Sequence, residues 1–317
     1  MDGIEARIRH KASLAKVMTA DEAAQLFRDG MMVATSGSTM GFPKATFQAL
    51  AERIKTQGGL KIDLLCAGPL SGQVEDVLAE VGGIRTRIGA MGGEKLRSAV
   101  NRGEVRFVEG KGAALPLQVK RGWYGAVDMM VIEAVGLTEE GNIIPSTAVY
   151  DSPEWLDAAS RIIVEINMNR PLALEGLHDV YQRGSEPIPI AGNPLTRIGL
   201  PYFTIDPKKI KAVVVSDMGD KPSGEEKPDQ TGNVIGNHLL DFFRREIAAG
   251  RLSEPLPRSN GAVQLSRAAI ASSTAATAPS FMAVPVACGR SPRRMLLRRN
   301  SSGSMPSARA IRSMWLS

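Results

Sequence analysis

The chain has 317 residues, with 39 Lys+Arg against 33 Asp+Glu and a formal net charge of +6. All of that surplus comes from residues 255–317, which hold nine arginines and no lysine, aspartate or glutamate, so residues 1–254 are slightly acidic. An acidic body argues against nucleic acid as its partner, and no apolar run approaches the roughly 18 residues of a membrane span.

The two cysteines, Cys66 and Cys288, lie far apart in the sequence. They predict neither a disulfide framework nor a zinc site, and therefore indicate a reducing compartment. The charged N-terminal segment has no apolar stretch of the kind that signal peptides contain. We therefore expect a cytoplasmic protein with no membrane association.

In the first half of the body, Thr19–Glu22 reads as a capping box that opens a helix ending near Gly30. Further along, apolar runs and helical spacing predict strands over 31–35, 61–66 and 105–108 and helices over 43–56, 72–81 and 94–101. In the second half, they predict strands over 127–132, 143–145, 162–166 and 212–216, followed by an amphipathic helix over 229–249.

Strands that are apolar throughout and separated by helices are typical of a parallel sheet that is covered on both faces. The predicted fold class is therefore α/β, with an open, mostly parallel sheet and helices on both of its faces. Because such sheets bind ligands at the carboxyl ends of their strands, the loops after Thr35, Cys66 and Ile132 are the places to look for a site.

This regular alternation stops at Glu254. Residues 255–317 are rich in Ala, Ser, Arg and Pro and show neither helical nor strand periodicity, which favours disorder. A shifted reading frame in GC-rich DNA would give the same composition. We therefore expect one domain over residues 1–254 and an irregular basic tail over 255–317.

The segment Ser36–Lys44 (SGSTMGFPK) carries the best local signal. A strand ends, two glycines let the backbone turn, and a helix begins, so exposed amides and the helix dipole would favour an anion or a developing oxyanion. Lys44 adds a positive charge. An ordinary strand-to-helix turn that needs glycine explains the same pattern at least as well, and the segment is neither a Walker A loop nor a dinucleotide fingerprint.

For two other candidate residues, a structural role is the favoured interpretation. Glu133 ends an apolar strand, where it would orient a substrate or partner or, more simply, cap a neighbouring loop. His178 lies in the segment Glu175–Asp179 without a histidine or cysteine at metal-ligand spacing, so a hydrogen-bonded structural histidine is the favoured interpretation and no metal site is expected.

Several blocks in order resemble the acetyl-CoA hydrolase/transferase family. Residues 36–45 resemble the family's SGFT..G.PKA, although the loop is one residue shorter and Ser38 replaces the usual Phe. The other similar blocks are 96–103 (family LR..IN.G), 127–147 (family VDVAVIEA..ITE.G.I.PTTSVG), 163–179 (family VIVEIN and LEG.HDI) and 206–210 (family DP.KI). The resemblance covers nearly all of residues 7–254.

This resemblance implies a CoA-transferase type of fold, with two similar α/β domains and an active site between them. It implies short-chain acyl-CoA chemistry, either CoA transfer to a small carboxylate or acetyl-CoA hydrolysis, through a glutamyl-CoA thioester. The family's nucleophilic glutamate follows the region that matches Gly250–Leu252, and no glutamate follows Glu254 here, so no catalytic residue is assigned. Coenzyme A is implied as a substrate and no other cofactor is expected.

By analogy with that fold, the loops Ser36–Lys44 and Gly68–Gly72 would line the cleft. The residues expected there are Gly37, Ser38, Gly41, Lys44 and Gly68, acting through backbone amides and one positive charge. The expected partners are acyl-CoA and small carboxylates, and a homo-oligomer is also considered. Two alternatives are a non-catalytic fragment, and an α/β binding module whose tail contacts a polyanion.

Overall fold

The structure is a computed structural model that describes residues 3–37, 40–112, 114–181, 196–221 and 229–251. The chain divides into two compact units, Met1–Glu225 and Glu226–Ser317. The boundary predicted at Glu254 stays a prediction, because the basic tail that it delimits lies outside the described residues.

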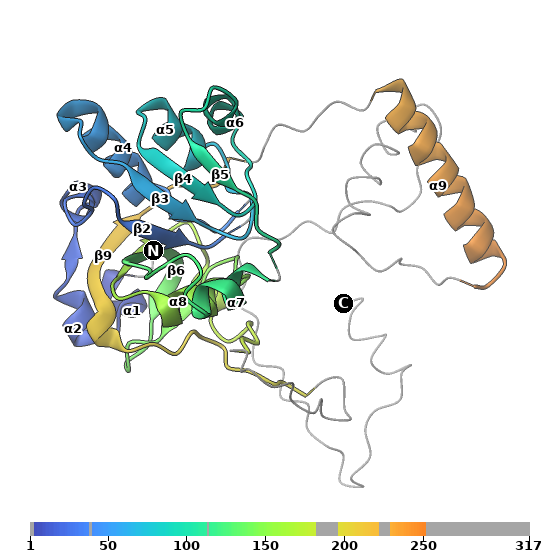
Figure 1. Ribbon diagram of the computed structural model, residues 1–317. Helices are drawn as coiled ribbons and strands as arrows, with labels where there is room; N and C mark the ends of the chain where they lie inside the picture. The colour runs from blue at the N-terminus through green and yellow to red at the C-terminus, as the bar shows by residue number, and fades with distance from the viewer. Residues whose placement is uncertain (1–2, 38–39, 113, 182–195, 222–228, 252–317) are drawn as a thin grey trace, which may run out of the picture. The chain divides into compact units, whose positions relative to one another are not determined.

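The first unit is built on one nine-stranded sheet within the described part of the chain (Figure 1). Its strands lie in the order β1-β9-β8-β6-β2-β3-β4-β5, with β7 paired to β6. The strands are β1 Val17–Met18, β2 Met32–Thr35, β3 Ile62–Leu65, β4 Ile84–Ile88, β5 Arg106–Val108, β6 Met129–Leu137, β7 Ile143–Pro145, β8 Ile162–Asn167 and β9 Ile210–Ser216.

Every neighbouring pair along that order is parallel, and among the strands of the described residues the β6–β7 pair is antiparallel. Successive residues of the central strands enter different cores: in β6, Val131 joins one apolar cluster and Ile132 joins the other. Because both faces are buried, the strands read as continuous apolar runs. The predicted fold class is confirmed.

The helices cover the two faces unequally (Figure 1). One core contains side chains of α3 Ala20–Ala24, α4 Ala45–Gln57, α5 Glu75–Glu80 and α6 Glu94–Asn101. The other contains side chains of α7 Leu115–Lys120 and α8 Ser152–Ala158, together with Ile8 after the short helix α1 Ile4–Arg7. The remaining short elements of this unit are α2 Lys11–Leu14 and the 3-10 helices Leu172–Leu174 and Pro207–Lys209.

The capping box is present at the start of α3, where Glu22 N donates to Thr19 Oγ1 and Thr19 N donates to Glu22 Oε2. The helix ends at Ala24, earlier than the predicted end near Gly30. The predicted helices at 43–56, 72–81 and 94–101 correspond to α4, α5 and α6. Sequence reasoning thus located these elements, with the largest error at their ends.

Strand β4 and helices α7 and α8 are not among the predicted elements. In β4 the arginines Arg85 and Arg87 interrupt the apolar pattern. Arg87 is nevertheless fully buried, because its Nε donates to Glu75 Oε1 at 2.8 Å and its other nitrogens donate to backbone carbonyls. A buried arginine with its own counter-ion makes a core strand look like a solvent-exposed one.

The second unit contains the helix α9 Gln230–Ala248, which corresponds to the predicted amphipathic helix. Its N-cap is Asp229, whose Oδ1 accepts from Gly232 N at 2.6 Å. Val234, Ile235 and Phe242 of its apolar residues are exposed, and the rings of Phe242 and Phe243 meet edge to face at 5.7 Å. No helix in the described part of the chain is long and apolar enough to cross a membrane.

Candidate functional site

The loop after β2 turns at glycines. Gly37 has a φ of 134° and Gly41 a φ of 72°, values that residues with a side chain rarely adopt. A Cβ added at Gly41 would lie 2.8 Å from the Cβ of Ala148, so this loop also approaches the segment before α8 too closely for a side chain. The turn itself therefore requires these glycines. Ser38 lies outside the described residues.

The N-terminus of α4 does bind an anion, and that anion is a carboxylate of the protein itself. The carboxylate of Glu165, on β8, accepts hydrogen bonds from the backbone N–H groups of Lys44 (2.9 Å), Ala45 (3.0 Å) and Thr46 (2.9 Å). The hydroxyls of Thr46 and Ser216 also donate to it, at 2.9 and 3.1 Å. The expectation that these amides are free for an external anion is therefore wrong, because Glu165 already satisfies them.

The side chain of Lys44 is fully buried among oxygen atoms. Its Nζ lies 2.5 Å from Glu133 Oε2 and 2.9 Å from Asp220 Oδ1, and it donates to the carbonyl of Phe42 at 2.9 Å. The expected positive charge is present, but two carboxylates neutralise it inside the protein. Lys44 therefore organises the loop after β2 from within.

Glu133 is the centre of a buried charge network, which we define as Lys44, Glu133, Asn167, Arg170 and Asp220. Besides Lys44, Glu133 accepts from Asn167 Nδ2 at 2.8 Å and from Arg170 Nε at 3.0 Å. It lies directly beside Glu165 in the register of β6 and β8. Two adjacent carboxylates are tolerated there because one meets the two cations and the other meets the α4 N-terminus.

Asp220 closes the network from the segment that follows β9. Its carboxylate accepts from Lys44 Nζ, from Arg170 Nη2 and, at 3.4 Å, from the N–H of Gly41. Burial acts to raise the pKa of Asp220, but the hydrogen bonds from Lys44 and Arg170 outweigh it and hold that pKa below its ordinary value. The segment after β9 is thus fastened to the loop after β2.

A second polar group, the Ser36 cluster, comprises Ser36, Cys66, Ala67, Asp151 and Ser152. Ser36 and Ser152 share a hydrogen bond of 2.5 Å between their hydroxyls, and Asp151 Oδ2 accepts from Ala67 N at 2.8 Å. Burial raises the pKa of Asp151 to about 6, with partial compensation from the Ala67 N–H. Burial also raises the pKa of the Cys66 thiol well above its ordinary value, so that thiol stays protonated and is not poised as a nucleophile.

The loop after β3 is braced by the buried ion pair of Arg87 and Glu75. Arg87 Nη2 donates to the carbonyl of Gly68 at 3.0 Å, so the backbone oxygen of that predicted site residue is occupied. Glu75 Oε2 accepts from the N–H groups of Gly92 (2.7 Å) and Gly93 (2.6 Å). The two loops predicted to line a cleft are therefore both held by buried charge pairs.

His178 is half-buried, and burial lowers the pKa of its imidazole. Its neighbour Asp179 accepts from Ile198 N at 3.2 Å and Gly199 N at 2.6 Å, which ties the segment to a distant part of the chain. No three His, Cys, Asp or Glu side chains in the described part of the chain are placed to hold a metal ion.

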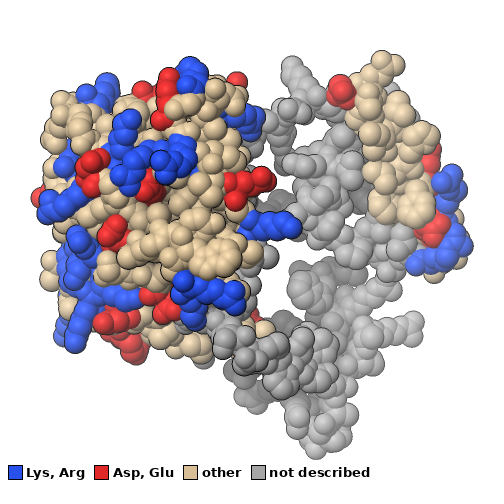
Figure 2. Space-filling view, viewed as in Figure 1, with Lys and Arg blue, Asp and Glu red and all other residues tan. Residues whose placement is uncertain are grey.

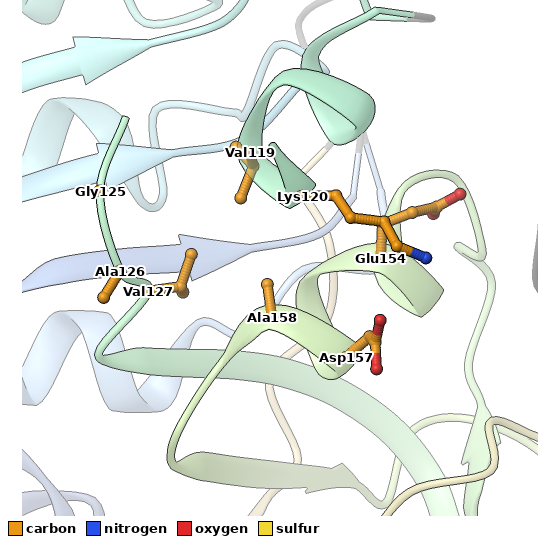
Figure 3. Close-up of a pocket in the computed structure, with 8 residues that line it drawn as sticks. All are labelled: Val119, Lys120, Gly125, Ala126, Val127, Glu154, Asp157 and Ala158. Atoms are coloured by element: carbon orange, nitrogen blue, oxygen red, sulfur yellow. The ribbon is translucent and has the colours of Figure 1, made fainter. Parts of the chain in front are cut away.

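Two pockets lie away from these loops. One of about 270 Å³ is lined by α7, α8 and the residues before β6, including Lys120, Glu154 and Asp157 (Figure 3). Val127 in its wall precedes β6, which places this pocket at the amino ends of the strands. The other, about 250 Å³, is lined mainly by apolar residues such as Leu156, Val180 and Phe203. Neither contains a residue of the buried charge network or of the Ser36 cluster.

Sequence reasoning missed Glu165, Arg170, Asp151 and Asp220. Glu165 had a readable signal, since a single carboxylate in the apolar run IIVEI must find buried donors. The other three lie in connecting segments, where nothing in the spacing reveals their partners.

Comparison with known proteins identifies the family to which this chain is similar. Residues 1–215 match the acetyl-CoA hydrolase/transferase N-terminal domain. The chain is 33% identical over 276 residues to the succinyl-CoA:acetate CoA-transferase of Clostridium kluyveri, an alignment that covers 84% of this chain and 51% of that protein. It is 33% identical over 283 residues to the acetyl-CoA hydrolase of Schizosaccharomyces pombe, covering 84% and 54%.

A third relative, the propanoyl-CoA:succinate CoA transferase of Escherichia coli, is 32% identical over 264 residues, covering 80% of this chain and 54% of that protein. The chain thus spans about half the length of the curated relatives it matches. Among solved structures, RipA from Yersinia pestis matches with a TM-score of 0.52 at 16% identity, over 76% of this chain and 50% of that one. That likeness concerns the fold alone.

Proposed function

This chain belongs to the acetyl-CoA hydrolase/transferase family, and we propose that it acts on short-chain acyl-CoA as the N-terminal part of a CoA-transferase or acetyl-CoA hydrolase. The observation that carries the proposal is the 33% identity over 84% of the chain to a succinyl-CoA:acetate CoA-transferase. The loops after β2 and β3 lie at the carboxyl ends of parallel strands, which is where sheets of this kind bind ligands. Their positions therefore support a ligand site at these two loops.

The proposed chemistry follows from the resemblance. A glutamate carboxylate attacks the thioester carbonyl of acyl-CoA, the CoA thiolate leaves, and an acyl–glutamyl anhydride forms. The thiolate then attacks the glutamyl carbonyl, releasing the acyl group as a carboxylate and leaving a glutamyl-CoA thioester. An acceptor carboxylate completes a transfer, whereas water completes a hydrolysis.

The described residues would contribute backbone and scaffold to that site. We propose that the turns at Gly37 and Gly41, with Ser38 between them, and the loop at Gly68 line the cleft. The buried charge network fixes the first of these loops, and the Arg87–Glu75 ion pair fixes the second, so that their backbone is already in place when the ligand binds. Lys44 enters this proposal as a positioning residue, because its charge is fully neutralised.

Acetate, propionate and succinate are the acyl and acceptor groups we propose, since the names of the relatives combine acetyl-, propanoyl- and succinyl-CoA. Coenzyme A enters as a substrate, and no bound cofactor is proposed.

A cytoplasmic location is proposed because Cys66 is a free, buried thiol. Homo-oligomerisation is part of the proposal and is measured by light scattering after gel filtration.

The test is a titration of the purified chain with acetyl-CoA, followed by single-turnover incubation with radiolabelled acetyl-CoA and succinate. We expect saturable binding of acetyl-CoA. We expect no hydroxylamine-trappable glutamyl adduct, because residues 255–317, where the resemblance would place the start of the second half, contain no glutamate. Failure to bind acetyl-CoA at any concentration would contradict the proposal. Turnover would assign the nucleophile to a carboxylate within residues 1–254.

A further inference from the structure

Tyr150 has an unusual backbone. Its φ is 35°, and it is the single non-glycine residue with positive φ among the described parts of the chain. An L-residue adopts this region only when the surrounding structure imposes it, and such outliers gather at functional sites. The family pattern that residues 127–147 resemble continues to a glycine at this position, which is the residue that positive φ favours.

Tyr150 lies where the candidate loops meet. Two residues before it, Ala148 contacts the loop after β2, because a Cβ at Gly41 would lie 2.8 Å from the Cβ of Ala148. On the other side, a Cβ added at Gly112 would lie 2.6 Å from the hydroxyl of Tyr150 and 4.0 Å from the Cβ of Ala67. The phenol therefore reaches the segment after β5 at Gly112, and Ala67 of the loop after β3 lies next to that same glycine.

Core packing does not account for the strain. Tyr150 is 55% exposed, while the next residue, Asp151, is 3% exposed and anchored to the N–H of Ala67. A ring that is held rigidly at its base and open at its face is available to a ligand. Partial burial, followed by the charge of Asp151, raises the pKa of Tyr150, and the hydroxyl is a hydrogen-bond donor at neutral pH.

We propose that Tyr150 is a ligand-contacting residue of the acyl-CoA site, with its ring and hydroxyl facing the ligand where the loops after β2, β3 and β5 meet. This inference rests on the proposed function and adds a contact that the glycine of the family pattern cannot make. The ring offers an apolar face to the acyl chain or pantetheine arm, and the O–H group offers a donor to a carbonyl oxygen.

The test uses the full chain and measures two quantities, the urea midpoint of unfolding and the Kd for acetyl-CoA by titration calorimetry. Tyr150→Gly should raise the midpoint, because glycine relieves the strained φ, and should weaken acetyl-CoA binding at least ten-fold. Tyr150→Ala should weaken binding similarly without the gain in midpoint, because alanine keeps the unfavourable φ. Tyr150→Phe keeps the ring and removes the hydroxyl, so it measures what the hydroxyl contributes to binding. A parallel titration with free CoA measures what the acyl group contributes.

Trp123→Ala is the matched control, because Trp123 is another exposed aromatic side chain, 65% exposed, in the connection between α7 and β6. It should leave the Kd unchanged. If Tyr150→Gly stabilises the chain but binds acetyl-CoA as tightly as the wild type does, the inference is overturned and the proposed function stands. If the wild type does not bind acetyl-CoA, the proposed function itself fails and the inference fails with it.

Discussion

At the scale of single residues, buried charged side chains determine the structure at the carboxyl ends of the central strands. Lys44 reads in the sequence as a cation facing a ligand, and in the structure it is enclosed by Glu133, Asp220 and a backbone carbonyl. Removing Lys44 leaves two carboxylates with Arg170 as their shared counter-ion, and this uncompensated charge is far more destabilising than the loss of an exposed ion pair.

Lys44→Met should therefore destabilise the chain by about 3–5 kcal/mol, because Glu133 and Asp220 lose a shared buried counter-ion. Urea denaturation at pH 7 measures this change. Lys55→Met is the matched control, since Lys55 is 66% exposed and pairs only with exposed Glu52. Equal effects of the two substitutions would show that the buried network adds nothing to stability.

Asp151 gives a residue-scale prediction for pH. Its folded-state pKa of about 6 lies above the ordinary 3.8, so folding favours the protonated acid. Stability from this group is therefore full below about pH 4 and is lost as the pH rises through 6. The difference between the two values corresponds to about 3 kcal/mol.

Asp151→Asn should remove that loss, so the variant should gain on the wild type in free energy of unfolding between pH 4 and pH 7. Paired urea titrations at half-unit pH steps measure the difference, which cancels the contribution of the other titrating groups. Parallel profiles for the two proteins would mean that Asp151 titrates normally.

At the scale of elements, helix α4 is fastened to the sheet by a single carboxylate. Glu165 of β8 accepts three backbone N–H groups at the start of α4, together with two hydroxyls. This arrangement is the anion-binding helix N-terminus expected from the sequence, but the anion comes from a strand about 120 residues away. The contact sets where α4 begins and how the loop before it leaves β2.

Glu165→Gln should destabilise the chain by about 2–4 kcal/mol, because the neutral amide loses the charge-assisted bonds and turns an N–H₂ group toward other donors. Thermal and urea unfolding measure the change. Glu22→Gln, in the exposed capping box of α3, serves as the control and should have a much smaller effect. An unchanged stability for Glu165→Gln would contradict a fastening role.

At the scale of the whole molecule, the apolar cores and the charge network of the first unit lie within residues 8–220 of the described chain. The buried members of both apolar cores lie between Ile8 and Val214, and the last member of the charge network is Asp220. On the face shown in Figure 2, basic and acidic side chains of this unit are interspersed. The unit thus has its own core and its own charge balance at the site.

A chain that ends at Lys221 should therefore keep the urea midpoint and slope of the full chain's main unfolding transition. The slope reports the surface exposed on unfolding, so it tests whether the same core unfolds. A lower midpoint in the shortened chain would show that residues beyond Lys221 support the first unit.

The sequence alone was sufficient for the fold class and for most of the long elements, but not for β4, α7 and α8. Runs such as Met129–Ile132 and Ile162–Val164 are apolar at every position because both faces of a parallel sheet are buried, and that local signal predicts the fold without knowing the strand order. Gly37 and Gly41 were likewise readable, because a tight turn leaves few alternatives to glycine. The blocks that resemble the family were also readable from the sequence, because each block is a contiguous run of residues.

Only the tertiary structure decided which charges meet. Glu133, Lys44 and Arg170 converge because β6 lies between β2 and β8, an order that no local pattern encodes. The same order brings Glu165 to α4, and it places Lys44 and Arg170, which are far apart in the sequence, on the same carboxylate. A buried charge is stable only beside its partner, and when the partner lies a hundred residues away its identity depends on the packing of the whole sheet.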